Sequence, residues 1–414
     1  MSILNTSVSG MLADTSWLSS ISQNVSNSNT TGYKNVETEF SALVDEAATA
    51  AEPGMGVTTS LRTLNSLQGS VVSTSTNTDL AVQGAGYFVV SDASGTLYLT
   101  RNGSFTPDAS GNLVNSSGYY LMGAEAGAGG STPSFSSLSD LSKVNVTSAG
   151  LLATPTTTGS IAANLPSTAV PIATANLPST NTSSSVYTAE TSLVAYDNLG
   201  GAHQLDIYFS NTGSNTWEVD VFDHSAASAS GGFPYSSGPL ATQTLTFNST
   251  NGSLSSGSPI SIAIPNGQTM SLDLSNTTQL ASAFAVSSAT ANGNAPATLT
   301  GESFGTDGKL SFQYSSGLSQ VAYQIPLGNV PSPDNLTTLN GGVLSANSQS
   351  GQVTLGAPGS GGLGSLVPSA LESSTVDLAT ELTNMIQAQS AYEANSKVFQ
   401  TGANIFDVLN HLTS

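Results

Sequence analysis

Apolar residues recur at intervals of seven near the beginning of the chain. The N-terminal stripe consists of Leu4, Val8, Met11, Leu18 and Val25, in which Val8 is the intermediate position. One apolar stripe at this period predicts an amphipathic helix over about residues 3–27.

The C-terminal end repeats this pattern more strongly. Its main stripe, with one intermediate position at Leu382, consists of Leu371, Leu378, Leu382, Met385, Tyr392, Phe399 and Phe406. A second stripe consists of Val398, Ile405 and Leu412. These stripes predict a helix over about residues 375–412. A sustained spacing of seven favours coiled-coil packing, and an ordinary helix docked on its own domain is the alternative.

The sequence between the two helices indicates β structure. The segment YFVVSDASGTLYLT (87–100) contains two apolar runs around a turn, and SFTPDASGNLV (104–114) repeats that turn. Asn102-Gly103 is a further hairpin signal. More strands are expected in 187–222 and on to about residue 330. The predicted fold is mainly β with terminal α-helices, and the β domains are inserted between two helices that pair.

Three segments show neither the helical periodicity nor the strand-type pattern. Residues 148–186 are rich in Ser, Thr, Ala and Pro and predict loops and edge strands, while 355–370 resembles a Gly/Pro-rich linker. The polar segment 23–35 predicts the end of the first helix, because Asn and Ser favour caps and turns. Within it, Gly32 can adopt a positive φ, and Tyr33 offers a packing anchor.

Composition excludes several classes of partner and chemistry. The 414 residues include 6 Lys+Arg against 26 Asp+Glu, a formal net charge of −20. Nucleic acids and anionic lipid surfaces require clustered cations, so we expect neither as a partner. The chain has no Cys, which excludes disulfides and thiolate chemistry. No apolar run is long enough for a membrane span, and the N-terminus lacks the features of a secretory signal.

One motif suggests hydrolase chemistry. GESFG (301–305) matches the G-x-S-x-G pattern, whose serine sits on a strand-to-helix turn. Here a second strand is expected after Ser303, and the one histidine further along, His411, lies in the terminal helix. Gly84-Ala85-Gly86 lacks the third glycine of a phosphate-binding loop. We therefore predict no catalytic residue and no cofactor site.

Candidate metal ligands are equally sparse. His203 and Asp206 lie in a strand-like run, where we expect them to face solvent, and we expect no second cluster to converge on His224. The loop at Asp108 lacks the acidic density of a calcium site, and turn chemistry explains it better. We predict no metal site.

Several blocks resemble the bacterial flagellar rod and hook axial proteins. They are SVSGMLADTSWLSSISQNVSNSNTTGYKNVETEFSAL (7–43), TDLAVQGAGYFVV (78–90), YLTRNGSFTPDASGNLVNSSGYYLMG (98–123) and ALESSTVDLATELTNMIQAQSAYEANSKVFQT (370–401). In the middle of the chain, VAYDNLGGAHQLDIYF (194–209) and the following Trp217 are similar to the outer domain inserted in hook subunits. Thr375 and Ser390 depart from the family pattern, which has Asn and Arg there.

The resemblance implies a structural subunit that polymerises into a curved tube and transmits motor torque as a universal joint. It implies terminal helical segments 1–27 and 371–414, linkers 28–71 and 358–370, an inner β domain 72–147 and 300–357, and an outer β domain 148–299. The implied assembly interface comprises Leu4, Val8, Met11, Leu18, Val25, Tyr33, Leu371, Leu378, Leu382, Met385, Tyr392, Val398, Phe399, Ile405 and Phe406.

The implied partners are further copies of the chain, the distal rod protein, the hook cap, the hook–filament junction protein and the flagellar type III export apparatus. Export is expected without a cleaved signal peptide. Both ends are expected to become helical only when neighbouring copies cover their apolar stripes. Alternatives are another axial subunit and, from a different class, a secreted adhesin or surface-layer protein with the same Ser/Thr-rich acidic composition.

Overall fold

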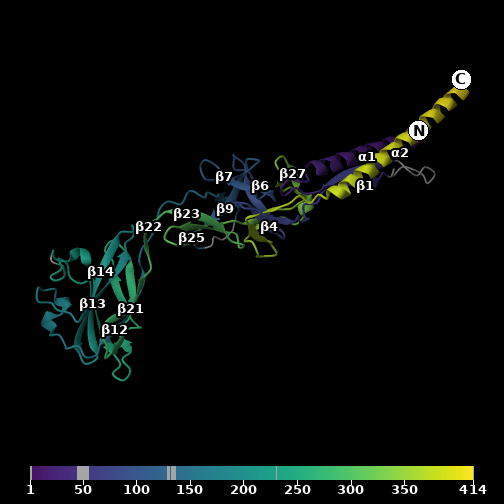
Figure 1. Cartoon of the computed structure of the whole chain (residues 1–414). Coiled ribbons are helices and arrows are strands. Elements are labelled where there is room, and N and C mark those ends of the chain that lie inside the picture. Colours follow the sequence, from purple (N-terminus) through teal and green to yellow (C-terminus); the bar gives the residue numbers. More distant parts are fainter. Residues whose placement is uncertain (1, 44–55, 128–130, 132–136, 230, 414) are drawn as a thin grey trace. The chain divides into compact units, whose positions relative to one another are not determined.

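The computed structural model describes residues 2–43, 56–127, 131, 137–229 and 231–413 (Figure 1). The chain forms two compact units. Unit 1 contains residues 1–148, 301–313 and 319–414, and unit 2 contains residues 149–300 and 314–318.

Unit 1 carries both long helices, α1 (Ser2–Ser26) and α2 (Leu378–Thr413), which lie side by side (Figure 1). Turns follow α1, and Gly32 adopts a φ of +70°. A Cβ at Gly32 would lie 2.7 Å from the carbonyl carbon of Arg101, so both the conformation and the close approach require glycine. The predicted end of the first helix and the predicted turn at Gly32 are confirmed.

The body of unit 1 is one large, mainly antiparallel sheet. Its described strands are β5 (Tyr87–Ser91), β6 (Leu97–Thr100), β7 (Phe105–Pro107), β8 (Leu113–Asn115), β9 (Tyr120–Glu125), β10 (Ser142–Lys143), β23 (Leu299–Phe304), β24 (Lys309–Tyr314), β25 (Ser319–Gln324), β26 (Leu327–Asn329), β27 (Thr337–Leu339), β28 (Val343–Ser345) and β29 (Thr354–Gly356). The central order is β25-β9-β5-β6-β28. The hairpin predicted within 87–100 is confirmed as β5 and β6, and Asp108 holds a turn by accepting the N–H groups of Ser110 and Asn112.

Two short ladders connect this body to the beginning of α2. The pairs are β3 (Val71–Ser73) with β31 (Ala370–Glu372), and β4 (Leu80–Gln83) with β30 (Ser365–Pro368). The expected linker 358–370 is therefore partly strand, and Leu371 lies in β31 and not on the helical stripe. Pairing partners almost 300 residues away in sequence leave no local signal, which explains this error.

A separate two-stranded hairpin lies within the segment 28–71, which we expected to be a linker. Its strands are β1 (Val36–Ala42) and β2 (Val57–Thr63). Most of their side chains are exposed, so the alternation of apolar and polar residues is weak. The hairpin packs on α1, where the rings of Trp17 and Phe40 meet edge to face at 5.6 Å.

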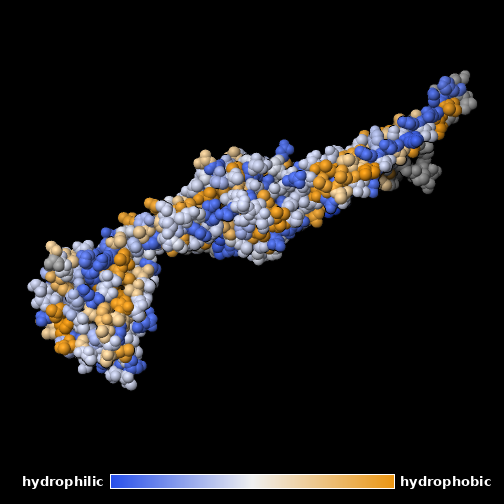
Figure 2. Space-filling view, viewed as in Figure 1, coloured by the Kyte–Doolittle hydropathy of each residue, from blue (hydrophilic) through white to orange (hydrophobic). Residues whose placement is uncertain are grey.

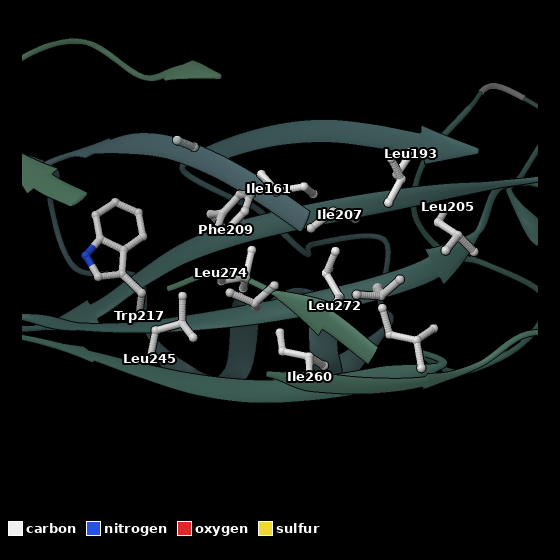
Figure 3. Packing of buried hydrophobic residues seen from close by; sticks show 14 of the residues in the cluster. Ile161, Leu193, Leu205, Ile207, Phe209, Trp217, Leu245, Ile260, Leu272 and Leu274 are labelled. Carbon is white, nitrogen blue, oxygen red and sulfur yellow. The ribbon is translucent and has the colours of Figure 1, made fainter. Parts of the chain in front are cut away.

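Unit 2 consists of two packed sheets and a short pair. The strands are β11 (Leu152–Thr154), β12 (Thr158–Pro166), β13 (Ala189–Tyr196), β14 (Ala202–Gly213), β15 (Thr216–Asp223), β16 (Ala241–Phe247), β17 (Leu254–Ser256), β18 (Ile260–Ala263), β19 (Thr269–Asp273), β20 (Thr278–Leu280), β21 (Ala285–Ala291) and β22 (Asn294–Ala297). One sheet has the order β13-β14-β15-β16-β17; the other has β18-β19-β12-β20, with β21 also paired to β12. Apolar side chains from both sheets fill the space between them, among them Phe209, Trp217 and Leu272 (Figure 3).

The prediction of loops and edge strands over 148–186 is wrong for β12. This strand pairs with β19, β20 and β21 and occupies the centre of its sheet. Its sequence TGSIAANLP contains few strong β-formers. Pairing on both sides and the burial of Ile161 and Leu165 in the core determine its conformation instead.

Candidate assembly interface and the joint behind it

The terminal helices are antiparallel. Asn24, near the end of α1, contacts Glu381 at the beginning of α2, whereas Asp14 contacts Asn395 further along α2. At Gly10 a Cβ would lie 2.7 Å from the side-chain nitrogen Nδ2 of Asn395, so the helices approach closely there. The predicted pairing of the two helices is confirmed.

Mostly small and polar residues, with Ile21 as an exception, form the seam between these helices. On α2 the inward positions are again seven apart, and they are Glu381, Ala388, Asn395 and Gly402. On α1, Ser7, Asp14 and Ile21 are buried at the same spacing. The seam therefore follows a heptad repeat that is offset from the apolar stripe, and periodicity of apolar residues alone did not reveal it.

The predicted interface residues remain incompletely covered within one chain. Eight are half-buried: Leu4, Met11, Leu18, Val25, Tyr33, Leu371, Met385 and Phe399. Seven are exposed: Val8, Leu378, Leu382, Tyr392, Val398, Ile405 and Phe406. Leu412 lies outside the described side chains. Apolar residues are visible along the helices of unit 1 in Figure 2.

Further exposed apolar residues extend this face. Leu12 and Ile386 are each 65% exposed and Val408 is 59% exposed. Leu12 follows Val8 by four positions and Ile386 follows Leu382 by four, a helical spacing that could have identified both. Large apolar side chains exposed in such numbers on two helices are typical of an interaction site.

Asn24 connects three segments of the chain. We refer to Asn24 and its contacts with Tyr33, Val36 and Glu381 as the joint. The side-chain amide of Asn24 donates to the carboxylate of Glu381 (3.1 Å) and to the carbonyl of Val36 (2.9 Å). Its side-chain oxygen accepts from the N–H of Val36 (3.0 Å) and from the hydroxyl of Tyr33 (3.2 Å). Because Asn24 is only 1% exposed, these bonds fix the direction in which the chain leaves α1.

The electrostatic environment at this point is that of a buried carboxylate. Burial raises the pKa of Glu381, while hydrogen bonds from Asn24 and Asn35 oppose that shift. Burial, and then the negative charge of Glu381, raise the pKa of Tyr33 to about 12. Tyr33 therefore acts here as a hydrogen-bond donor.

A buried ionic cluster lies next to the joint. Glu372 is fully buried and contacts the ammonium of Lys34 and the guanidinium of Arg101 (3.1 Å). The same carboxylate accepts the backbone N–H of Gly69 (2.8 Å). The two cations are each 5% exposed by side chain, and they also donate to backbone carbonyls, among them those of Leu67 and Gly84.

This cluster joins three parts of unit 1: the segment after α1, the large sheet and the strand before α2. Burial lowers the pKa of Lys34, and Glu372 opposes that shift. A buried cluster of this kind is strongly destabilised when one partner is lost. The sequence does not reveal this cluster, because Lys34 and Glu372 lie 338 residues apart in the chain.

The beginning of α2 is fixed separately. Asp377 caps the helix by accepting the N–H groups of Ala379 and Thr380, both at 2.9 Å, and these bonds lower its pKa. Thr375, where the sequence departs from the family pattern, accepts the N–H of Asn35 at 2.9 Å. These contacts explain why α2 begins at Leu378 and not at the expected position near 375.

The other candidate residues lie outside this interface. Ser303 lies in β23, so GESFG is not at a strand-to-helix turn. His224 lies beside Asp206, with its Nδ1 2.7 Å from a carboxylate oxygen of that residue. Among the described residues, no group of three or more potential ligands is placed to hold a metal ion. None of the described helices has the apolar length that a bilayer crossing requires.

Comparison with known families gives three matches. Residues 81–172 match the flagellar hook protein FlgE/F/G D1 domain, 164–294 match the flagellar basal body protein FlaE D2 domain, and 367–412 match the flagellar basal body rod FlgEFG protein C-terminal region. All three describe flagellar axial subunits.

Relatives that match over the whole length of the chain identify the family more specifically. The chain is 41% identical to the flagellar hook protein FlgE of Brucella abortus over 99% of its own length and 98% of the relative's. The corresponding identities are 40% for the Rhizobium meliloti protein and 32% for that of Salmonella typhimurium, with 98% of each relative covered. The crystal structure of Helicobacter pylori flagellar hook protein FlgE2 shares the fold, with a TM-score of 0.50 at 13% identity, over 73% of this chain and all of that one. The chain belongs to the flagellar hook protein FlgE family.

Proposed function

We propose that the chain is the repeating structural subunit of the flagellar hook and acts through assembly, not catalysis. The exposed apolar face of α1 and α2 carries this proposal, because nothing within the described chain covers it. Neighbouring copies would cover it in a helical tube, with the terminal helices forming the inner wall.

The energetics favour such an arrangement. Fully burying an exposed Leu, Ile or Phe side chain contributes roughly 1.5–3 kcal/mol, so three of the exposed residues on α2 would contribute at most roughly 4.5–9 kcal/mol per contact. That range is similar to the loss of translational and rotational freedom on association. Repeated contacts along a polymer are therefore needed for stable assembly.

Torque transmission would use the joint. The Asn24 contacts and the Glu372 cluster tie both helices to the β body of unit 1, so that a force on the helices reaches the body through buried bonds. In this proposal the distal rod protein and the hook–filament junction protein bind at the two ends of the tube. The hook cap guides growth, and the flagellar type III apparatus exports the chain uncleaved to the hook outside the cell.

Sedimentation and electron microscopy of purified full chains test the assembly face. Phe399→Asp should abolish tube formation, because assembly would bury an unpaired carboxylate. Gln387→Asp places the same charge at an exposed position of α2 whose neighbours one turn away are Thr383, Asn384, Ser390 and Ala391, and it should still assemble. Normal tubes from Phe399→Asp would contradict the proposal.

A further inference from the structure

Unit 2 has an unusual charge composition. Residues 149–300 contain seven carboxylates and no Lys or Arg, and residues 314–318 add no charge. The carboxylates are Glu190, Asp197, Asp206, Glu218, Asp220, Asp223 and Asp273. No lysine or arginine within the unit can neutralise them, so unit 2 favours a cationic partner.

Several of these carboxylates lie on one face of a sheet. Glu190 on β13 is directly opposite Tyr208 on β14, and Tyr208 is opposite Asp220 on β15. Asp206 is two residues before Tyr208 and therefore shares its face. This face points away from the apolar core between the sheets, to which Ile207 and Phe209 belong.

Aromatic rings gather at the same place. Tyr208, which is 4% exposed, has its ring centre 4.7 Å from that of Tyr187 and 5.0 Å from that of Phe233. Tyr187 is 41% exposed, so its ring is accessible from solvent. The faces of such rings carry partial negative charge and attract cations.

Of these groups, all but Asp220 line a pocket of about 730 Å³. Its wall includes the three aromatic rings together with Glu190, Asp206 and His224. Asp206 accepts the hydroxyl of Tyr235 (2.7 Å) and lies 2.7 Å from His224 Nδ1, which fixes its orientation. Burial and a hydrogen bond to Glu190 raise the pKa of Tyr187 to about 12.

We propose that this pocket binds an organic cation that carries an ammonium or guanidinium group. The cation would lie against the Tyr187 ring, with its charge facing Glu190 and Asp206. Aromatic rings combined with carboxylates recognise organic cations in this way, whereas the described residues offer no set of three ligands for a metal ion. This inference does not depend on the proposed role in the hook.

Calorimetric titration of the full chain with n-butylammonium chloride tests the proposal, with n-butanol as the neutral probe of similar shape. Saturable binding of the ammonium alone is expected. Tyr187→Leu should weaken binding by about 2- to 30-fold, which corresponds to one cation–π contact. Glu190→Gln, a conservative change at an exposed site, should weaken it several-fold.

Asp273→Asn is the matched control, since it removes one charge from unit 2 at a position outside the pocket and should leave the affinity unchanged. Absence of saturation, equal binding of n-butanol, or an equal effect of Asp273→Asn and Glu190→Gln would overturn the proposal. Repeating the titration on assembled polymer distinguishes two sources of the cation. If the natural cation is a Lys or Arg side chain of another copy, it would occupy the pocket in the polymer and block binding of n-butylammonium. If the natural cation is a free amine, the pocket would remain accessible to n-butylammonium in the polymer.

Discussion

Replacing Glu372 by Gln tests the buried ionic cluster most sharply. The substitution keeps the size of the side chain and removes its charge. Lys34 and Arg101, each 5% exposed, would then be buried without a counter-charge. Removing one partner of a buried ion pair costs about 3–5 kcal/mol. At about 2–4 °C per kcal/mol for a unit of this size, the melting temperature of unit 1 should fall by roughly 6–20 °C.

Differential scanning calorimetry can measure this shift, with the transition of unit 2 as an internal reference. Glu39→Gln is the matched control, because Glu39 forms an exposed pair with Arg62 and its loss should cost less than about 1 kcal/mol. Lys34→Met in the Glu372→Gln background should recover part of the loss, since one unpaired charge is removed. Equal, small shifts for Glu372→Gln and Glu39→Gln would refute the reasoning.

Three further predictions concern separate features. Asn24→Ala should destabilise unit 1 by about 1–3 kcal/mol, measured by urea unfolding, because it leaves buried groups unpaired; Asn29→Ala, at an exposed site, should not. Burial, reinforced by Glu218, raises the pKa of Asp220 from 3.8 to about 7. The folded state therefore holds this proton more tightly, and the stability of unit 2 should fall by at most roughly 3 kcal/mol as pH rises from about 5 to 8. Asp220→Asn should flatten that dependence in pH-dependent thermal melts, whereas an unchanged slope would contradict it. Residues 149–300 alone should melt cooperatively with a strand-type circular dichroism spectrum, because both core-forming sheets lie within them; a broad, non-cooperative transition would count against this.

A fragment of residues 72–357 would be a less suitable test of independent folding, although its hairpin turns close locally. The structure pairs β4 with β30 and β3 with β31, and both partners lie beyond residue 357. A fragment that ends there would leave these strands unpaired, so the outer unit is the better choice for this experiment.

Sequence patterns predicted those helices and hairpins that are determined by residues close together in the chain. The spacing of seven gave both helices, and turn residues such as Asp108 gave the hairpins. The polar seam was not predicted, because Asp14 and Asn395 carry no apolar signal and lie 381 residues apart. A separation of 338 residues likewise hides the contact of Lys34 with Glu372. The exposed hairpin β1–β2 was missed because alternation of apolar and polar residues arises only where one face is buried.

In the proposed tube, neighbouring copies cover the apolar face of the terminal helices. Helical reconstruction by electron cryomicroscopy of polymers grown from the full chain can test this arrangement. We expect α1 and α2 to line the inner wall of a tube, with Leu382, Ile386 and Ile405 in contact with adjacent copies. A polymer in which these side chains face solvent, or in which unit 2 forms the inner wall, would contradict it.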